Sequence, residues 1–228
     1  LILLLQLLLG LGYTALAHLA SLWHHDGLAL AALGALIAMF VVEPLLARRP
    51  LAFVATPLLA WGAWALYDAG HAALPLLLVP VVFVVGIAWI FARTLRPGSV
   101  PLITRIVVGI EGVADATVLA PDLQRYTRSL TAAWAAVLLA MAGANLLLAL
   151  LASPSGLLES LGVASPLPIS QAQWSLWANL LNYGVIGGFF IVEFAYRKRR
   201  FPGRYDGFPG FVRKLAGLGP VFWRDLLR

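Results

Sequence analysis

The segment from Trp174 to Arg200 constrains the fold more than any other part of the sequence. It begins with two tryptophans, Trp174 and Trp177, stays apolar over most of its length, and ends in the basic run RKRR. An apolar stretch long enough to cross a bilayer, with aromatic residues at one interface and cations at the other, is typical of a membrane-spanning helix. The segment therefore predicts that at least part of the chain lies in lipid.

The composition extends this prediction to the whole chain. Of 228 residues, 61% are hydrophobic and 11% are charged, whereas soluble domains are about half apolar and about one-quarter charged. Only helices and closed barrels satisfy their backbone hydrogen bonds in lipid, and barrel strands alternate apolar and polar residues. Runs such as LALAALGALIAMFVV do not alternate, so the predicted fold class is all-α and polytopic. The absence of cysteine excludes disulfides and thiolate chemistry.

Six membrane-spanning helices are predicted within a single integral membrane domain, residues 1–228. Each has the length needed to cross the hydrocarbon core, and the first lacks the cleavage site of a signal peptide. Pro57 in the third, and Pro75 and Pro80 in the fourth, predict a kink or an early helix start. The predicted spans are Leu1–Trp23, Gly27–Leu46, Leu51–Tyr67, Ala72–Phe91, Leu130–Ala152 and Trp174–Tyr196.

The basic residues predict the orientation of these spans. With six spans, all 16 Lys and Arg residues fall on the side that holds both termini and the second and fourth loops. The opposite side holds only the acidic residues Asp26, Asp68 and Glu159. Positively charged loops remain in the cytoplasm. We therefore expect a bacterial inner-membrane protein with both termini in the cytoplasm.

Two cytoplasmic segments have structure of their own in this prediction. In residues 93–129, the apolar spacing from Ile103 to Val113 predicts an amphipathic helix lying on the membrane, and Pro121 begins a helix that leads into the fifth span. The tail, residues 197–228, mixes aromatic and basic residues, which predicts short interfacial helices held by anionic headgroups. Docking of an acidic protein partner on the tail is the alternative. The docking residues expected are Arg197, Lys198, Arg199, Arg200, Arg213 and Lys214.

Polar side chains within the spans form two predicted layers. Asn145, Asn179 and Asn182 lie at similar depth in the outer half of the bilayer, and Tyr183 borders the same helix face. We expect Asn145 to form a hydrogen bond with Asn179 or Asn182. The three amides would either hold the helices together or form a ligand-binding layer. The glycines at 184 and 188 form a small-residue stripe that we also expect to be buried.

Glu43 and Glu193 form the second layer, near the cytoplasmic interface. Arg197 follows Glu193 by one helical turn, and Arg48 and Arg49 follow Glu43, so ion pairing is the simpler interpretation. An acid–base pair would require the two carboxylates to converge. No catalytic residue is assigned. The outer residues His18, His24, His25, His71, Asp26 and Asp68 match no metal motif, so no metal or cofactor is expected, and no basic face suggests nucleic-acid binding.

Several stretches together resemble a known family. They are PLITR at Pro101–Arg105, PDLQRYTRSLTAAWA at Pro121–Ala135, the spacing of Asn179, Asn182 and Glu193 before RKRRF, and the tail motif from Gly207 to Leu226. These resemble small polytopic inner-membrane proteins associated with aryl polyene and xanthomonadin-type pigment gene clusters. The resemblance covers mainly residues 100–228 and carries no catalytic residues. It implies a role in making, anchoring or exporting a lipid-like polyene.

The function expected from these observations is that of a non-enzymatic inner-membrane accessory protein for a polyene or acyl product. Its basic cytoplasmic face would dock anionic lipid headgroups or an acidic carrier protein, because charge complementarity accelerates encounter. A small-molecule or lipid transporter component is the alternative, and it would require a cavity that reaches the asparagine layer and a homodimer. A membrane-embedded acyl-modifying enzyme is the third interpretation.

Overall fold

A computed structural model describes most of the chain: residues 2–23, 25–153, 156–167, 169–170, 173, 176–177, 180–201, 208–219, 222–223 and 226. This part of the chain is mostly helical, with strands of only two residues, which confirms the all-α fold class. Two-residue strands, β1 (Ala152–Ser153) and β2 (Ile169–Ser170), flank the short helix α7 (Leu157–Ser160). The chain divides into two compact units, Leu1–Pro80 with Ala149–Pro168 and Val81–Leu148 with Ile169–Arg228.

Among the residues that the structure describes, five helices are long and apolar enough to cross a membrane, which supports a multi-pass membrane protein. Pro75 lies in the first turn of α4, which fits the helix start expected there, since the first turn needs no backbone donor. Pro57 and Pro80 lie inside α3 and α4, which continue past them. The helices are α1 (Ile2–Trp23), α2 (Asp26–Leu46), α3 (Pro50–Asp68), α4 (Leu74–Arg93) and α6 (Pro121–Leu151).

The region of the predicted sixth span is a π-helical segment, η2 (Leu180–Val185), followed directly by α9 (Ile186–Arg200). Trp174 and Asn179 lie outside the described residues. The helix continues through the basic run to Arg200, four residues beyond the predicted end. Basic residues at a helix C-terminus interact favourably with the helix dipole, which favours this extension.

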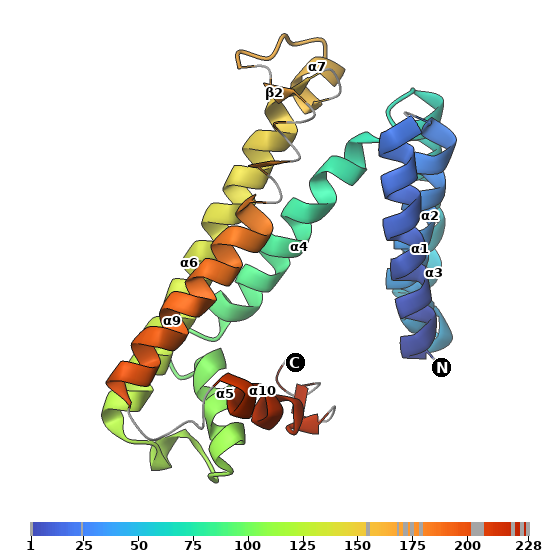
Figure 1. The fold of residues 1–228 in the computed structure, drawn as a ribbon. Coiled ribbons are helices and arrows are strands. Elements are labelled where there is room, and N and C mark those ends of the chain that lie inside the picture. Colours follow the sequence, from blue (N-terminus) through green and yellow to red (C-terminus); the bar gives the residue numbers. More distant parts are fainter. Residues whose placement is uncertain are drawn as a thin grey trace. The chain divides into compact units, whose positions relative to one another are not determined.

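In the first unit, α1, α2 and α3 lie side by side (Figure 1), joined by short turns. Its buried cluster consists of the alanines Ala20, Ala29 and Ala72, with Leu28 and Leu76 packed against them. Large side chains face outward instead, and Leu11 is 69% exposed. Small residues between helices and large apolar residues outside are the pattern expected where the surroundings are lipid.

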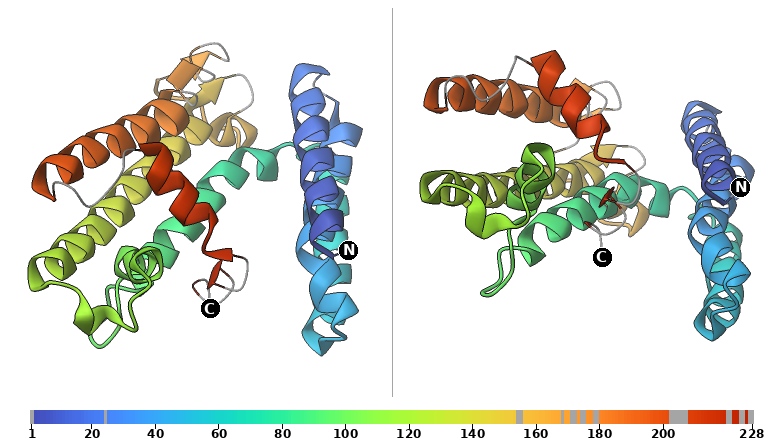
Figure 2. Two further views of the ribbon diagram at one scale, coloured as in Figure 1. Left: turned by 60° about the horizontal axis from the view of Figure 1, so that its bottom comes forward. Right: turned by 90° about the horizontal axis from the view of Figure 1, so that it is seen from below.

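In the second unit, the C-terminal part of α4 lies beside α6, and α9 lies along the other side of α6 (Figures 1 and 2). Trp134 of α6 joins them. Its ring centroid lies 6.2 Å from that of Phe91 on α4 and 4.7 Å from that of Phe189 on α9, the latter edge to face. Edge-to-face pairs contribute about 0.5–1.5 kcal/mol beyond area burial. Trp134 is therefore the aromatic junction of the three helices.

Helix α5 (Leu102–Glu111) begins at a cluster of buried threonines. The hydroxyl of Thr94, at the end of α4, accepts a hydrogen bond from the Leu102 N–H at 2.9 Å, and the hydroxyl of Thr131 accepts one from the Ile103 N–H at 3.3 Å. Thr104 and Thr127 share a hydrogen bond of 2.7 Å. The first N–H groups of a helix lack intrahelical acceptors. Side chains of the neighbouring helices supply them here and fix the start of α5.

The amphipathic helix predicted around Ile103 to Val113 is confirmed, but its apolar face is covered by protein. Val107 packs in a buried cluster with Leu119, Leu123 and Phe201, and Ile103, Val108, Val113 and Tyr126 surround this cluster. The expectation that this face lies on the membrane is therefore wrong for these residues. The sequence pattern identifies an apolar face but not its partner, which comes from segments distant along the chain.

Part of the tail also packs on α5. Helix α10 (Phe208–Ala216) contacts α5, and beyond it Leu218 and Phe222 lie over Gly109. A Cβ atom at Gly109 would lie 2.7 Å from Phe222 Cε2, closer than side chains tolerate. Glycine at this position thus allows the tail to approach the helix. Arg213 and Lys214 of α10 remain exposed.

Replacing Thr131 by valine should destabilise the second unit by about 1–3 kcal/mol, because the Ile103 N–H would remain buried without its acceptor. The measurement is thermal unfolding of the purified chain in mild detergent. Thr14→Val is the matched control, since the Thr14 hydroxyl is exposed and bonds to Gly10 O of its own helix. Equal unfolding midpoints for the two variants would contradict this role of Thr131.

Candidate functional site

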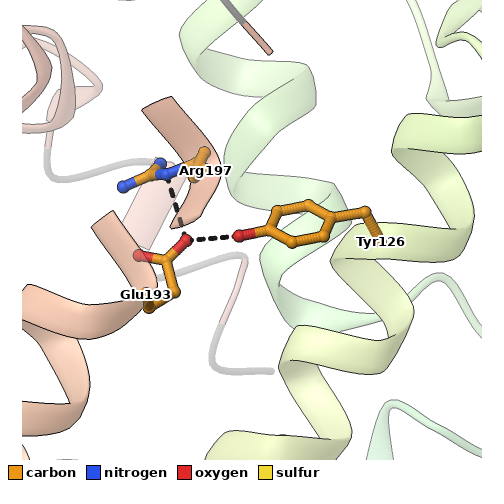
Figure 3. A network of polar contacts seen from close by, with 3 residues as sticks. All are labelled: Tyr126, Glu193 and Arg197. Carbon is orange, nitrogen blue, oxygen red and sulfur yellow. Dashed lines mark hydrogen bonds and ion pairs between the residues drawn. The ribbon is translucent and has the colours of Figure 1, made fainter. Parts of the chain in front are cut away.

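A polar network in the second unit joins Tyr126, Glu193 and Arg197 (Figure 3). The Tyr126 hydroxyl of α6 donates a hydrogen bond to Glu193 Oε1 of α9 at 2.8 Å. Arg197 Nε lies 3.0 Å from the same oxygen. Glu193 is 8% exposed and Arg197 is 6% exposed. A carboxylate, a guanidinium and a phenol therefore meet where little solvent reaches them.

Each member of this network has a local reason for its position. Glu193 and Arg197 are one turn apart on α9, so their side chains share one helix face. Tyr126 reaches them because α6 has 31 residues, about 46 Å at about 1.5 Å per residue, whereas the hydrocarbon core is about 30 Å thick. The first two to three turns of α6 extend beyond the predicted start of the span at Leu130. The pairing of Glu193 with Arg197 confirms the interpretation made from their spacing.

A pocket of about 580 Å³ lies beside this network, between α6 and α9. This volume lies in the range of small-molecule sites. From α6 it is lined by residues spaced three and four apart along one face, and α9 contributes a face with the same spacing. The lining residues are Asp122, Arg125, Tyr126, Ser129, Leu130, Ala133, Phe189, Val192, Glu193, Tyr196 and Arg200.

The lining changes in character along the pocket. On α6 it runs from Asp122 and Arg125 to Leu130 and Ala133, and on α9 from Phe189 and Val192 to Arg200. The two helices are antiparallel, since Tyr126 of α6 meets Glu193 whereas Trp134, later on α6, meets Phe189, earlier on α9. Charged and apolar residues are therefore grouped at opposite ends. Two stacked rings, Tyr126 and Tyr196 with centroids 5.9 Å apart, lie between these ends.

The basic residues predicted to dock lipid or a partner do not all remain accessible. Lys198, Arg199 and Arg200 are exposed, as are Arg213 and Lys214. Arg197 is buried and paired with Glu193, which corrects its assignment as a docking residue. A carboxylate one turn earlier on the same helix face draws this single guanidinium of the RKRR run inward.

The predicted asparagine layer is described only in part. Asn145 is 6% exposed, and its amide donates a hydrogen bond to Met141 O of its own helix at 3.0 Å. Asn179 and the Asn182 side chain lie outside the described residues. The expected bond between Asn145 and one of them stays a prediction.

Tyr183 and the glycine stripe differ from expectation. Tyr183 is 77% exposed rather than bordering a buried layer, and Gly184 and Gly188 are also exposed. The predicted faces assumed an uninterrupted α-helix. A π-helical segment from Leu180 to Val185 has more residues per turn, so it rotates every preceding residue relative to α9. π-Helical turns are rare, and nothing in the sequence marks this one.

The remaining acidic and histidine residues form no site in the described part of the chain. Glu43 is exposed, belongs to the first unit and has no ion pair with Arg48 or Arg49, so that predicted pairing is wrong. His24 lies outside the described residues. Among the described residues, no group of three or more His, Asp or Glu side chains is positioned to hold a metal ion.

Comparison of the chain with protein-family models, with curated protein sequences and with solved structures gives no match. The resemblance to the pigment-cluster proteins therefore stays a hypothesis that rests on the quoted motifs.

Sequence reasoning missed Tyr126 and the pocket. The available signal was the spacing of Tyr126, Ser129, Leu130 and Ala133, which share one face once the helix is taken to start at Pro121. A tyrosine at the predicted membrane boundary is a further signal, because aromatic residues concentrate there. That this face meets Glu193 depends on how the two helices pack.

Proposed function

We propose that the chain is a six-span inner-membrane protein, with both termini in the cytoplasm, that assists the synthesis, anchoring or export of a polyene or acyl product. Its basic cytoplasmic end docks anionic lipid or an acidic carrier protein. The observation that supports this proposal is the grouping of cations at one end of the second unit, beside a pocket whose lining changes from charged to apolar. An amphiphilic product at a membrane surface has the same two-part character.

The basic end is assembled from several segments. The Arg128 guanidinium donates a hydrogen bond to Leu95 O, and Arg105 donates one to Val100 O, so both hold the connection between α4 and α5. Lys198 and Arg199 follow on α9, and α10, which packs on α5, adds Arg213 and Lys214. Clustered cations attract anionic headgroups by about 1 kcal/mol each near the surface.

The orientation is tested by single cysteines, since the chain contains none of its own. In intact cells with a permeabilised outer membrane, an impermeant thiol reagent should label Ser165→Cys but not Ser99→Cys or Ala216→Cys. Labelling of S165C without A216C would also place a crossing between the two positions, which is the sixth span. Labelling of S99C or A216C from outside would overturn the proposed orientation.

The role itself is tested by two measurements. Deleting the gene should remove or alter a polyene or acyl product in lipid extracts, and the wild-type gene should restore it. The purified chain should also retain acyl carrier protein at low salt and release it at high salt, because interactions between exposed charges are screened. Replacing Lys198, Arg199, Arg213 and Lys214 by glutamine should abolish this retention. An unchanged lipid profile together with salt-insensitive or absent retention would overturn the proposed role.

A further inference from the structure

We infer that the pocket between α6 and α9 binds a single-chain carboxylate amphiphile, with its carboxylate between Arg125 and Arg200 and its chain along Leu130, Ala133, Phe189 and Val192. This inference deepens the proposed function and rests on it, because it names the chemical class of the product held. Three properties of the pocket support this inference: the arrangement of its charged residues, its position relative to the membrane and its size.

The charges at the head end favour an anion. Glu193 is matched within the protein by Arg197 and by the Tyr126 hydroxyl. Among the residues that the structure describes, neither Arg125 nor Arg200 has a carboxylate within ion-pair distance. Arg125 Nε has only a long contact, 3.4 Å, with Pro121 O. Asp122 offsets one of the two cations, so one positive charge remains at this end of the pocket.

Arginine also suits a carboxylate by its geometry. The planar guanidinium presents two parallel N–H donors that match the two oxygens of a carboxylate. Arg125 and Arg200 come from facing helices, so they approach the head end from two sides. Ser129, next along the α6 face, offers a hydroxyl donor between the charged and apolar parts.

The position of the pocket matches an amphiphile at a leaflet surface. The predicted fifth span begins at Leu130, so Asp122, Arg125 and Ser129 lie outside it while Ala133 lies inside. Only from Leu130 to Ala133 does this face enter the predicted span, by about 4.5 Å at about 1.5 Å per residue. The pocket therefore crosses the membrane interface, with its charged end outside the span and its apolar end just inside the hydrocarbon core.

The size of the pocket favours one chain over two. A volume of about 580 Å³ is that of a site for one small molecule. Phe189, edge to face with Trp134, lies at the apolar end. The occupant is therefore a free long-chain carboxylate rather than a two-chain phospholipid.

The test uses the purified full chain in mild detergent and a long-chain fatty acid containing a conjugated tetraene, whose fluorescence rises in apolar surroundings. We expect saturable binding. Arg125→Gln and Arg200→Gln should each weaken it by about tenfold or more, because each removes a charge-assisted hydrogen-bond donor. Ala133→Phe, which fills the apolar end, should abolish it.

Matched controls separate the pocket from the surface. Arg199→Gln and Ala132→Phe change exposed neighbours that do not line the pocket, and both should bind like the wild type. The methyl ester of the probe lacks the anionic head and should bind at least tenfold more weakly. Unfolding midpoints of all variants are measured in parallel, and probe binding is compared per folded molecule.

Three results would overturn the inference: equal binding of the methyl ester, equal weakening by R199Q and R200Q, or displacement of the probe by an anionic phospholipid at lower concentration than by an unlabelled fatty acid. The last result would assign the pocket to membrane lipid. Probe binding, the lipid profile of the deletion strain and retention of acyl carrier protein are three separate measurements, so failure of this inference is distinguishable from failure of the proposed function.

Discussion

Glu193→Ala should destabilise the second unit by about 3–5 kcal/mol, the cost of removing one partner of a buried ion pair. The variant leaves the Arg197 guanidinium, 6% exposed, without its carboxylate and the Tyr126 hydroxyl without its acceptor. The expected result is a markedly lower thermal unfolding midpoint in mild detergent. Glu193→Gln should lose less stability than Glu193→Ala, because the amide oxygen still accepts the hydrogen bond from Tyr126.

Two further variants show whether the loss comes from the stranded charge. Arg199→Ala removes an exposed cation two residues beyond Arg197 and should change stability by no more than about 0.5 kcal/mol. Glu193→Met combined with Arg197→Met removes both charges and should be more stable than either single variant, because no uncompensated charge remains. An unchanged midpoint for E193A would contradict the structural role of the pair.

Trp134→Ala should destabilise the second unit by about 3 kcal/mol, at the lower end of the range for buried tryptophan because the ring is only half-buried. It removes the aromatic contacts with Phe91 on α4 and Phe189 on α9 together. We expect a lower unfolding midpoint and faster proteolysis of the connection between α4 and α5. Trp61→Ala is the control, since Trp61 is 70% exposed. Equal losses in the two variants would indicate that Trp134 acts only as a lipid-facing side chain.

The two variants affect different ends of the same pocket. Glu193 and Arg197 fix the boundary between its charged and apolar parts, whereas Trp134 supports Phe189 at its apolar end. W134A should therefore weaken binding of the carboxylate probe through the chain end. This effect is indirect, because Trp134 does not line the pocket.

The candidate site was predictable only where its members are neighbours in sequence. The ion pair of Glu193 with Arg197 follows from a spacing of four on one helix. Tyr126 is 67 residues distant from Glu193 along the chain, so no periodicity relates the two. The threonines around α5 are equally remote, since Thr131 caps Ile103 from a different helix. Face assignments in the sixth predicted span were wrong for Tyr183 because a π-helical segment changes the rotation per residue.

The sequence alone determined the helices and their lipid setting. Apolar runs of sufficient length and the absence of alternation specify helices, because each helix can satisfy its backbone hydrogen bonds within itself. Only the tertiary structure decided which faces meet: that α5 is covered by Leu123 and Phe201, that Arg197 turns inward while Arg200 does not, and that α6 and α9 line an open pocket. The physical reason is that secondary structure depends on local hydrogen bonds and periodicity, whereas a site depends on contacts between residues far apart in the chain.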